Sequence, residues 1–187
     1  MYQKQTGLIL AFHGCDLKTQ KEVLHSPSNI LRASKNEYDW LGNGLYFWEN
    51  SPERAMRFAR EVKKREPEKI KTPAVIGAVI GLGKCLDLLD AENLELVKAA
   101  YADVKAIFES AGKPFPQNSD NLLLRPLDCL VIEHLLDGTD FDSVRGLFPE
   151  GKPLYTGAGF RDKDHIQICI RNADCIKGYF LPRKTIG

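Results

Sequence analysis

The sequence lacks an excess of charge of either sign, because 26 lysine and arginine residues stand against 25 aspartate and glutamate residues. A composition without a strong overall field does not indicate broad binding to nucleic acid or to an anionic membrane surface. Long hydrophobic runs are also missing, and the apolar run near the N-terminus extends only from Gly7 to Phe12. We therefore expect neither a membrane span nor a signal peptide, and we expect a cytoplasmic protein.

The five cysteines include no C-x-x-C pair, and their number is odd. This pattern argues against a disulfide framework and a zinc site, and it favours packed thiols in a reducing compartment. A chain of 187 residues can bury a hydrophobic core without such support. We expect one domain, residues 1–187, and no bound metal.

The sequence does contain an alternation of short apolar segments and capped helices. Strands are expected at 8–13, 45–48, 74–82, 141–148, 165–172 and 175–181, with a brief strand at 30–32. Helices are expected at 17–26, 52–64, 90–111 and 127–136, the first three behind Asp16, Ser51 and Asp90 as capping residues. The absence of a regular βαβ rhythm favours an α+β domain with mostly antiparallel sheets.

Two short stretches carry the strongest signal for a functional site. His13 ends the first expected strand and precedes Gly14, where a ligand could approach the backbone closely. Further along the chain, Gly42–Gly44 leads into the aromatic run Tyr46–Trp48, directly before a capped helix. Each stretch alone is explained by a capping histidine or an aromatic plug, but the two together indicate a site.

This arrangement resembles the catalytic core of ADP-ribosyltransferases of the diphtheria-toxin and poly(ADP-ribose) polymerase branch. In that branch a His-Gly pair ends the first strand. A G-x-G-hydrophobic-Tyr-Phe segment then leads into a helix with a second aromatic residue, here Phe58. The resemblance covers residues 8–60 and returns at 165–180, which is similar to the late strand pair of the family. It implies a single-domain fold of two mostly antiparallel sheets around an NAD cleft, with flanking helices.

The resemblance further implies that NAD+ is a co-substrate, cleaved at the nicotinamide glycosidic bond through an oxocarbenium-like transition state. His13 would bind a ribose, and Tyr46 and Phe58 would stack on the nicotinamide ring. In the expected donor loop, Arg32 could bind a phosphate or be a solvated residue, and Asp39 and Trp40 could contact the pyrophosphate side or anchor the loop. The cofactor-binding candidates are His13, Gly14, Arg32, Asp39, Trp40, Gly44, Tyr46 and Phe58.

The sequence departs from the family at the third catalytic position, which is usually glutamate. An ungapped alignment places Gln167 there, with His165 two residues earlier, and strand alternation would turn both side chains toward the cleft. Glutamine can hydrogen-bond a ribose hydroxyl but cannot act as a base. This favours single transfer over chain elongation, and the alternative is an exposed polar strand face. The catalytic candidates are His13, Tyr46, His165 and Gln167.

The sequence thus predicts a mono-ADP-ribosyltransferase acting on a macromolecule, with nucleic acid slightly preferred over protein. We expect an intracellular toxin or defence effector, with an antitoxin or inhibitor protein as a further partner. The loop 154–164 stands where the family has its acceptor-recognition loop, and its Tyr155, Phe160 and Arg161 could bind the acceptor. The alternatives are an NAD glycohydrolase, an RNA 2′-phosphotransferase-like enzyme, and a silent module that binds NAD or ADP-ribose.

Overall fold

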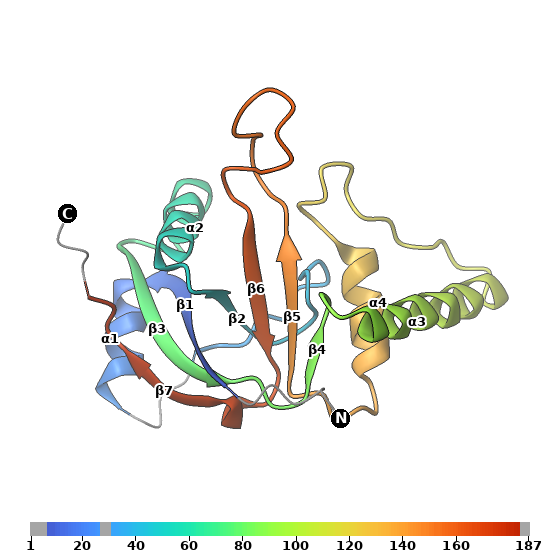
Figure 1. Cartoon of the computed structure of the whole chain (residues 1–187), viewed down its shortest axis with the longest axis horizontal. Coiled ribbons are helices and arrows are strands. Elements are labelled where there is room, and N and C mark those ends of the chain that lie inside the picture. The colour runs from blue at the N-terminus through green and yellow to red at the C-terminus, as the bar shows by residue number, and fades with distance from the viewer. Residues whose placement is uncertain (1–6, 27–30, 184–187) are drawn as a thin grey trace.

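The computed structural model describes residues 7–26 and 31–183. The strands are β1 (Leu8–Asp16), β2 (Leu45–Glu49), β3 (Pro73–Gly81), β4 (Cys85–Asp87), β5 (Ser143–Phe148), β6 (His165–Ile170) and β7 (Ile176–Phe180). The helices are α1 (Leu17–His25), α2 (Pro52–Arg65), α3 (Ala91–Ser110) and α4 (Pro126–Leu136), with a 3-10 turn at Ala173–Cys175. Together they form an α+β domain (Figure 1).

The helix starts follow the expected capping signals. Asp16, Ser51 and Asp90 each precede a helix, and each side chain accepts a hydrogen bond from a backbone N–H of the first turn. These bonds satisfy N–H groups that have no partner within the helix. The predictions of α1, α2 and α3 from their caps are therefore confirmed.

The expectation of two sheets is wrong, because all seven strands form one sheet in the order β4-β5-β6-β2-β1-β3-β7. Neighbouring strands are antiparallel except β4 and β5, which are parallel. The two late strands expected at 165–172 and 175–181 are present as β6 and β7, but they do not pair with each other: β6 lies between β5 and β2, and β7 pairs with β3 at an edge. The partner of a strand is decided by contacts with residues that are distant in the sequence. The periodicity of a single strand contains no information on that choice.

The brief strand expected at 30–32 does not form at residues 31 and 32, and Ile30 lies outside the described residues. Pairing in this segment occurs slightly later, where Ser34 makes an isolated bridge with Gly44. Two backbone hydrogen bonds between Ser34 and Gly44, of 2.8 and 3.1 Å, hold the segment against the start of β2.

Both faces of the sheet bury hydrophobic side chains. On one face, Phe47 and Ile168 belong to a large cluster that α1 joins through Val23. On the other face, α2 packs against β1 and β3, and α4 covers Val144 and Cys169 (Figure 1). Strand β6 therefore carries buried residues on both sides, at the centre of the molecule.

All five cysteines are free and buried, which confirms the expectation of packed thiols. Among the helices of the described ranges, none is long and apolar enough to cross a membrane.

Candidate functional site

His13 is held in place by the backbone of the neighbouring strand. Its Nδ1 lies 2.8 Å from the carbonyl oxygen of Tyr46, and its ring meets the edge of Phe47. Burial is the main cause that lowers the pKa of His13, so the imidazole is neutral near pH 7. Because a carbonyl only accepts, Nδ1 carries the proton and Nε2 is left as an acceptor.

The glycines of the two motifs are each required by packing. A Cβ at Gly14 would overlap the carbonyl oxygen of Ala55 on α2. One at Gly44 would lie 2.6 Å from the carbonyl oxygen of Ile170. Gly42 has φ of 76°, and a side chain there would meet Glu133. Packing alone therefore explains why these positions are glycine, and close approach of a ligand is a second explanation.

Tyr46 uses its hydroxyl to fix the turn before β2. The hydroxyl donates to the carbonyl oxygen of Gly42 at 2.7 Å and accepts from the N–H of Leu41 at 2.8 Å. Burial raises the pKa of this phenol well above its usual value. The Tyr46 hydroxyl is thus a structural group, and only its ring remains for stacking.

The side chains of His13 and Tyr46 lie on opposite faces of the sheet. Phe12 pairs with Trp48, and side chains alternate along each strand. His13 therefore shares a face with Phe47, whereas Tyr46 shares the other face with Trp48. The structure links the two motif residues through the hydrogen bond from the His13 ring to the Tyr46 carbonyl oxygen, but it does not bring their side chains onto one surface.

The face that carries Tyr46 and Trp48 continues onto β6. Gln167 lies opposite Trp48 and Cys169 lies opposite Tyr46, so alternation places His165 there as well. These three residues differ in solvent exposure: Cys169 is fully buried and His165 is 6% exposed, whereas Gln167 is half-buried. Of the two β6 candidates, Gln167 is the more accessible.

His165 is enclosed by three aromatic rings. The ring centroids of Trp40, Trp48 and Phe148 lie 6.2, 6.4 and 5.9 Å from that of His165. Its Nδ1 lies 2.6 Å from the carbonyl oxygen of Lys163, and its buried Nε2 has no hydrogen-bond partner within the described ranges. Burial is the largest cause that lowers the pKa of His165, so Nε2 is an unpaired acceptor near pH 7.

Arg54 and Trp48 add unpaired donors beside this acceptor. The Arg54 guanidinium is 8% exposed, donates through Nη2 to Glu150 at 2.7 Å, and stands 5.5 Å from the centroid of the Trp48 ring. Its Nε and Nη1, like Trp48 Nε1, have no partner in the part of the chain that the structure describes. Glu150 also lies 4.0 Å from His165 Nδ1, so Arg54, Trp48 and His165 share one neighbourhood.

We call Trp48 Nε1, Arg54 Nε and Nη1, and His165 Nε2 the unpaired cluster. Buried polar atoms in folded proteins almost always have a hydrogen-bond partner, and each one without a partner costs about 1–3 kcal/mol. Several such atoms on neighbouring side chains therefore indicate that water or a ligand group completes them. The unpaired cluster is the strongest candidate for a binding site on the β2–β6 face.

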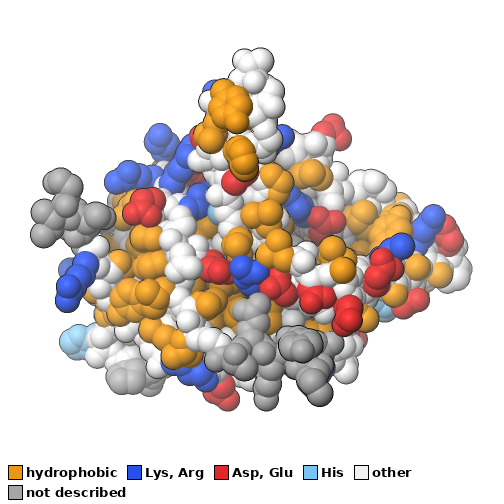
Figure 2. All heavy atoms as spheres, viewed as in Figure 1, with side chains coloured by type: hydrophobic (Ala, Val, Ile, Leu, Met, Phe, Trp, Pro, Cys, Tyr) orange, Lys and Arg blue, Asp and Glu red, His pale blue; other side chains and the backbone are white. Residues whose placement is uncertain are grey.

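The loop between β5 and β6 is fixed at its base and exposed at its tip. Its base is held on α2 by ion pairs that join Arg54 to Glu150, Arg57 to Asp162 and Lys163 to Glu61. At the tip, Leu154, Tyr155 and Phe160 are each about 60% exposed, and Figure 2 shows hydrophobic atoms gathered on this protrusion. Arg161 braces the loop by donating to the carbonyl oxygen of Gly151 at 3.1 Å.

The residues expected to form a donor loop serve mainly as anchors. Asp39 accepts a hydrogen bond from the N–H of Asn36 at 3.0 Å. The Trp40 indole donates to the carbonyl oxygen of Leu123 at 3.0 Å, and its ring packs on Phe148. Arg32 is exposed, whereas Phe58 packs against Trp48 at 4.8 Å between ring centroids.

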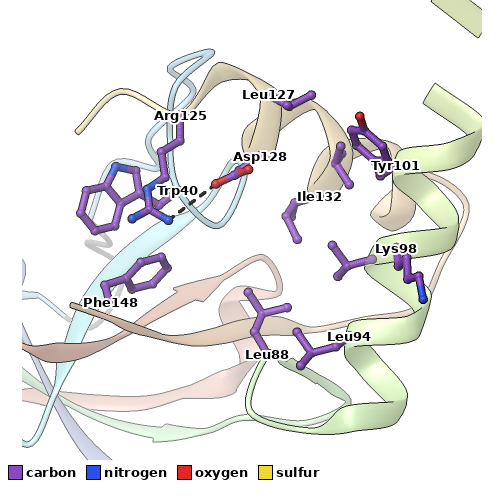
Figure 3. A pocket seen from close by; sticks show the side chains of 12 residues that line it. Trp40, Leu88, Leu94, Lys98, Tyr101, Arg125, Leu127, Asp128, Ile132 and Phe148 are labelled. Atoms are coloured by element: carbon purple, nitrogen blue, oxygen red, sulfur yellow. Dashed lines mark ion pairs between the residues drawn. The ribbon is translucent and has the colours of Figure 1, made fainter. Parts of the chain in front are cut away.

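Two pockets open elsewhere on the described surface. One of about 480 Å³ lies between α3 and α4, and Trp40 lines it (Figure 3). One of about 330 Å³ lies between residues 31–35 and the end of β6, and Gly44 lines it. Neither is lined by His13, Tyr46, His165 or Gln167, and neither includes a residue of the unpaired cluster.

The sequence interpretation overlooked Arg54 and Glu150. A basic residue in the first turn of an amphipathic helix normally indicates a solvent-facing position. Helical spacing nevertheless places Arg54 on the same stripe as Phe58 and Val62, which is the side that packs. The position of Arg54 on the apolar stripe was the available sign that its charge is buried. Its partner, Glu150, lies 96 residues away in the sequence.

Comparison with known proteins leaves the family open. No family model matches this chain, and no solved structure matches it. An uncharacterized protein of Methanocaldococcus jannaschii is 23% identical over 192 residues, which cover 89% of this chain and 83% of that protein. That similarity extends along most of both chains and carries no information on activity.

Proposed function

We propose that this protein binds NAD+ and transfers its ADP-ribosyl group to a macromolecule. The observation that carries the proposal is the composition of the unpaired cluster. Trp48 and Arg54 offer donors, and His165 Nε2 offers an acceptor. A group that completes all of them must both accept and donate hydrogen bonds, as a ribose hydroxyl or a carboxamide does and a fully ionised phosphate does not. The nicotinamide riboside half of NAD+ contains both groups.

The arrangement of the motif strands supports the same proposal. The segments that resemble the ADP-ribosyltransferases lie on β1, β2 and β6, which are adjacent in the sheet although far apart in the sequence. Aromatic side chains stand beside the unpaired cluster, with Trp48 and Phe58 in contact. Such rings favour a flat cationic ring such as that of nicotinamide.

In the proposed reaction the bond between the ribose C1′ and the nicotinamide nitrogen breaks, and its electron pair leaves with nicotinamide. A nucleophile of the acceptor then bonds to C1′, and its proton passes to water. Gln167 lies on the same face as Trp48, where its amide would hydrogen-bond a ribose hydroxyl as positive charge develops. A neutral amide cannot deprotonate an acceptor ribose, which is consistent with single transfer.

We further propose that the tip of the β5–β6 loop recognises the acceptor. Tyr155 and Phe160 present exposed rings on a base that ion pairs fix to α2. Exposed aromatic rings stack on unpaired bases, and this favours single-stranded nucleic acid. With a net charge of only +1, the contact would be local rather than driven by a broad electrostatic field.

Incubation with NAD+ labelled in the ADP-ribose half, in the presence of separate RNA, DNA and protein pools, tests these proposals. We expect nicotinamide release and label on nucleic acid. Phe160→Ala should lose labelling while slow nicotinamide release persists, and Ile107→Ala, which removes another exposed apolar side chain, on α3, should behave as wild type. Nicotinamide without label in any pool would indicate a glycohydrolase, and no nicotinamide at all would rule out the transferase.

A further inference from the structure

The pocket between α3 and α4 has the size and composition of a small-molecule site. Its volume of about 480 Å³ falls in the range of ligand pockets. Aliphatic side chains from α3, α4 and the residue after β4 form half of the lining, and Figure 3 shows Leu88, Leu94 and Ile132 on this side. At the other end, the Arg125 guanidinium stands against the rings of Trp40 and Phe148, which also pack on each other (Figure 3).

Arg125 is fixed in orientation and yet keeps donors for a ligand. Its guanidinium carbon lies 4.2 Å from the Trp40 ring centroid and 5.0 Å from that of Phe148, and the side chain is only 15% exposed. Its Nε donates to the carbonyl oxygen of Leu122 at 2.9 Å. Asp128 forms an ion pair with Nη1 at 3.6 Å. A ligand carboxylate would therefore accept hydrogen bonds mainly from Nη2, beside this ion pair.

The charges nearby indicate a single negative charge on the ligand. Asp128 offsets part of the Arg125 charge, and Lys98 at the rim is 76% exposed and paired with Glu95. A dianionic phosphate would meet too little positive charge here, whereas a carboxylate carries only one negative charge. The faces of Trp40 and Phe148 are already occupied by Arg125, so the remaining lining suits an aliphatic body.

We propose that this pocket binds an aliphatic carboxylate, with the carboxylate on Arg125 and the chain between α3 and α4. The site is separate from the unpaired cluster, because Trp40 and Phe148 stand between Arg125 and His165. The proposal does not depend on the reaction proposed for the β2–β6 face.

Calorimetric titration with decanoate, and with decanol as its uncharged counterpart, tests the proposal. We expect saturable one-to-one binding of decanoate to wild type. Arg125→Gln should weaken decanoate binding roughly tenfold to a hundredfold and leave decanol binding unchanged, because only the charged head loses its partner. Leu94→Trp should block both ligands by filling the pocket, whereas Leu96→Trp on the same helix, which does not line it, should not.

Absence of saturable decanoate binding to wild type would overturn the proposal. So would equal affinities of Leu94→Trp and Leu96→Trp for decanoate, since the ligand would then bind elsewhere. Unchanged decanoate binding by Arg125→Gln would overturn the assignment of the carboxylate to Arg125. Self-association of the wild type that Leu94→Trp alone abolishes would make the pocket an interface between two copies of the chain instead.

Discussion

Replacing Gln167 with alanine should reduce nicotinamide release by roughly a hundredfold while NAD+ affinity falls by less than about threefold. Gln167 is half-buried and lies opposite Trp48 in the sheet, so its side chain is on the face that carries Trp48 and His165 of the unpaired cluster. An interaction that strengthens as charge develops on the ribose lowers the turnover rate when it is lost, with little effect on ground-state binding. Single-turnover nicotinamide release and calorimetric NAD+ titration measure the two quantities.

The matched variants separate this role from a general loss of structure. Gln167→Glu should retain or raise nicotinamide release, because a carboxylate adds negative charge beside the developing cation. Gln117→Ala, on an exposed loop, should behave as wild type. If Gln167→Ala keeps full activity and His165→Ala loses it, His165 holds the catalytic position. Full activity in both variants would contradict any role of this part of β6 in the reaction.

Gly14→Ala should lower the free energy of unfolding by about 3 kcal/mol, because the added methyl group would overlap the Ala55 carbonyl oxygen and displace α2 from β1. For a chain of this size the melting temperature should fall by roughly 6–12 °C. Denaturant titration and a thermal melt measure both effects. Gly178→Ala on β7 is the control, since its Cβ would meet no atom within 4 Å and should change stability little.

This variant also separates the two explanations of Gly14. A glycine needed only for ligand approach would lose NAD+ binding on substitution and keep the stability of wild type. A glycine needed for packing would lose stability first. Equal stability of Gly14→Ala and Gly178→Ala would show that α2 does not rest on β1 as closely as the structure has it.

Local chemistry made much of the fold predictable. Asp16, Ser51 and Asp90 cap helices through bonds to residues two or three positions away, so the neighbouring sequence contains the whole signal. Strand β4 was overlooked because a three-residue strand has no measurable periodicity, and it forms only by pairing with β5. The positions of β6 and β7 in the sheet, where they are not neighbours, likewise depend on which other strands each of them packs beside.

The site itself stays a prediction. The strands β1, β2 and β6 that carry its expected residues lie side by side in the sheet. The sequence did not indicate that register sends His13 and Tyr46 to opposite faces, since this depends on the pairing of Phe12 with Trp48. Nor did it indicate that Arg54 is buried, because its partner Glu150 arrives from a distant loop.

The indole region of a ¹H–¹⁵N spectrum tests the central claim most directly. The chain has two tryptophans, of which Trp40 donates to the Leu123 carbonyl whereas Trp48 Nε1 has no partner among the described residues. If NAD+ completes the unpaired cluster, titration should shift the Trp48 signal strongly and the Trp40 signal much less, with a Trp40→Phe sample to assign them. A Trp48 signal that stays in place at saturating NAD+ would contradict the account.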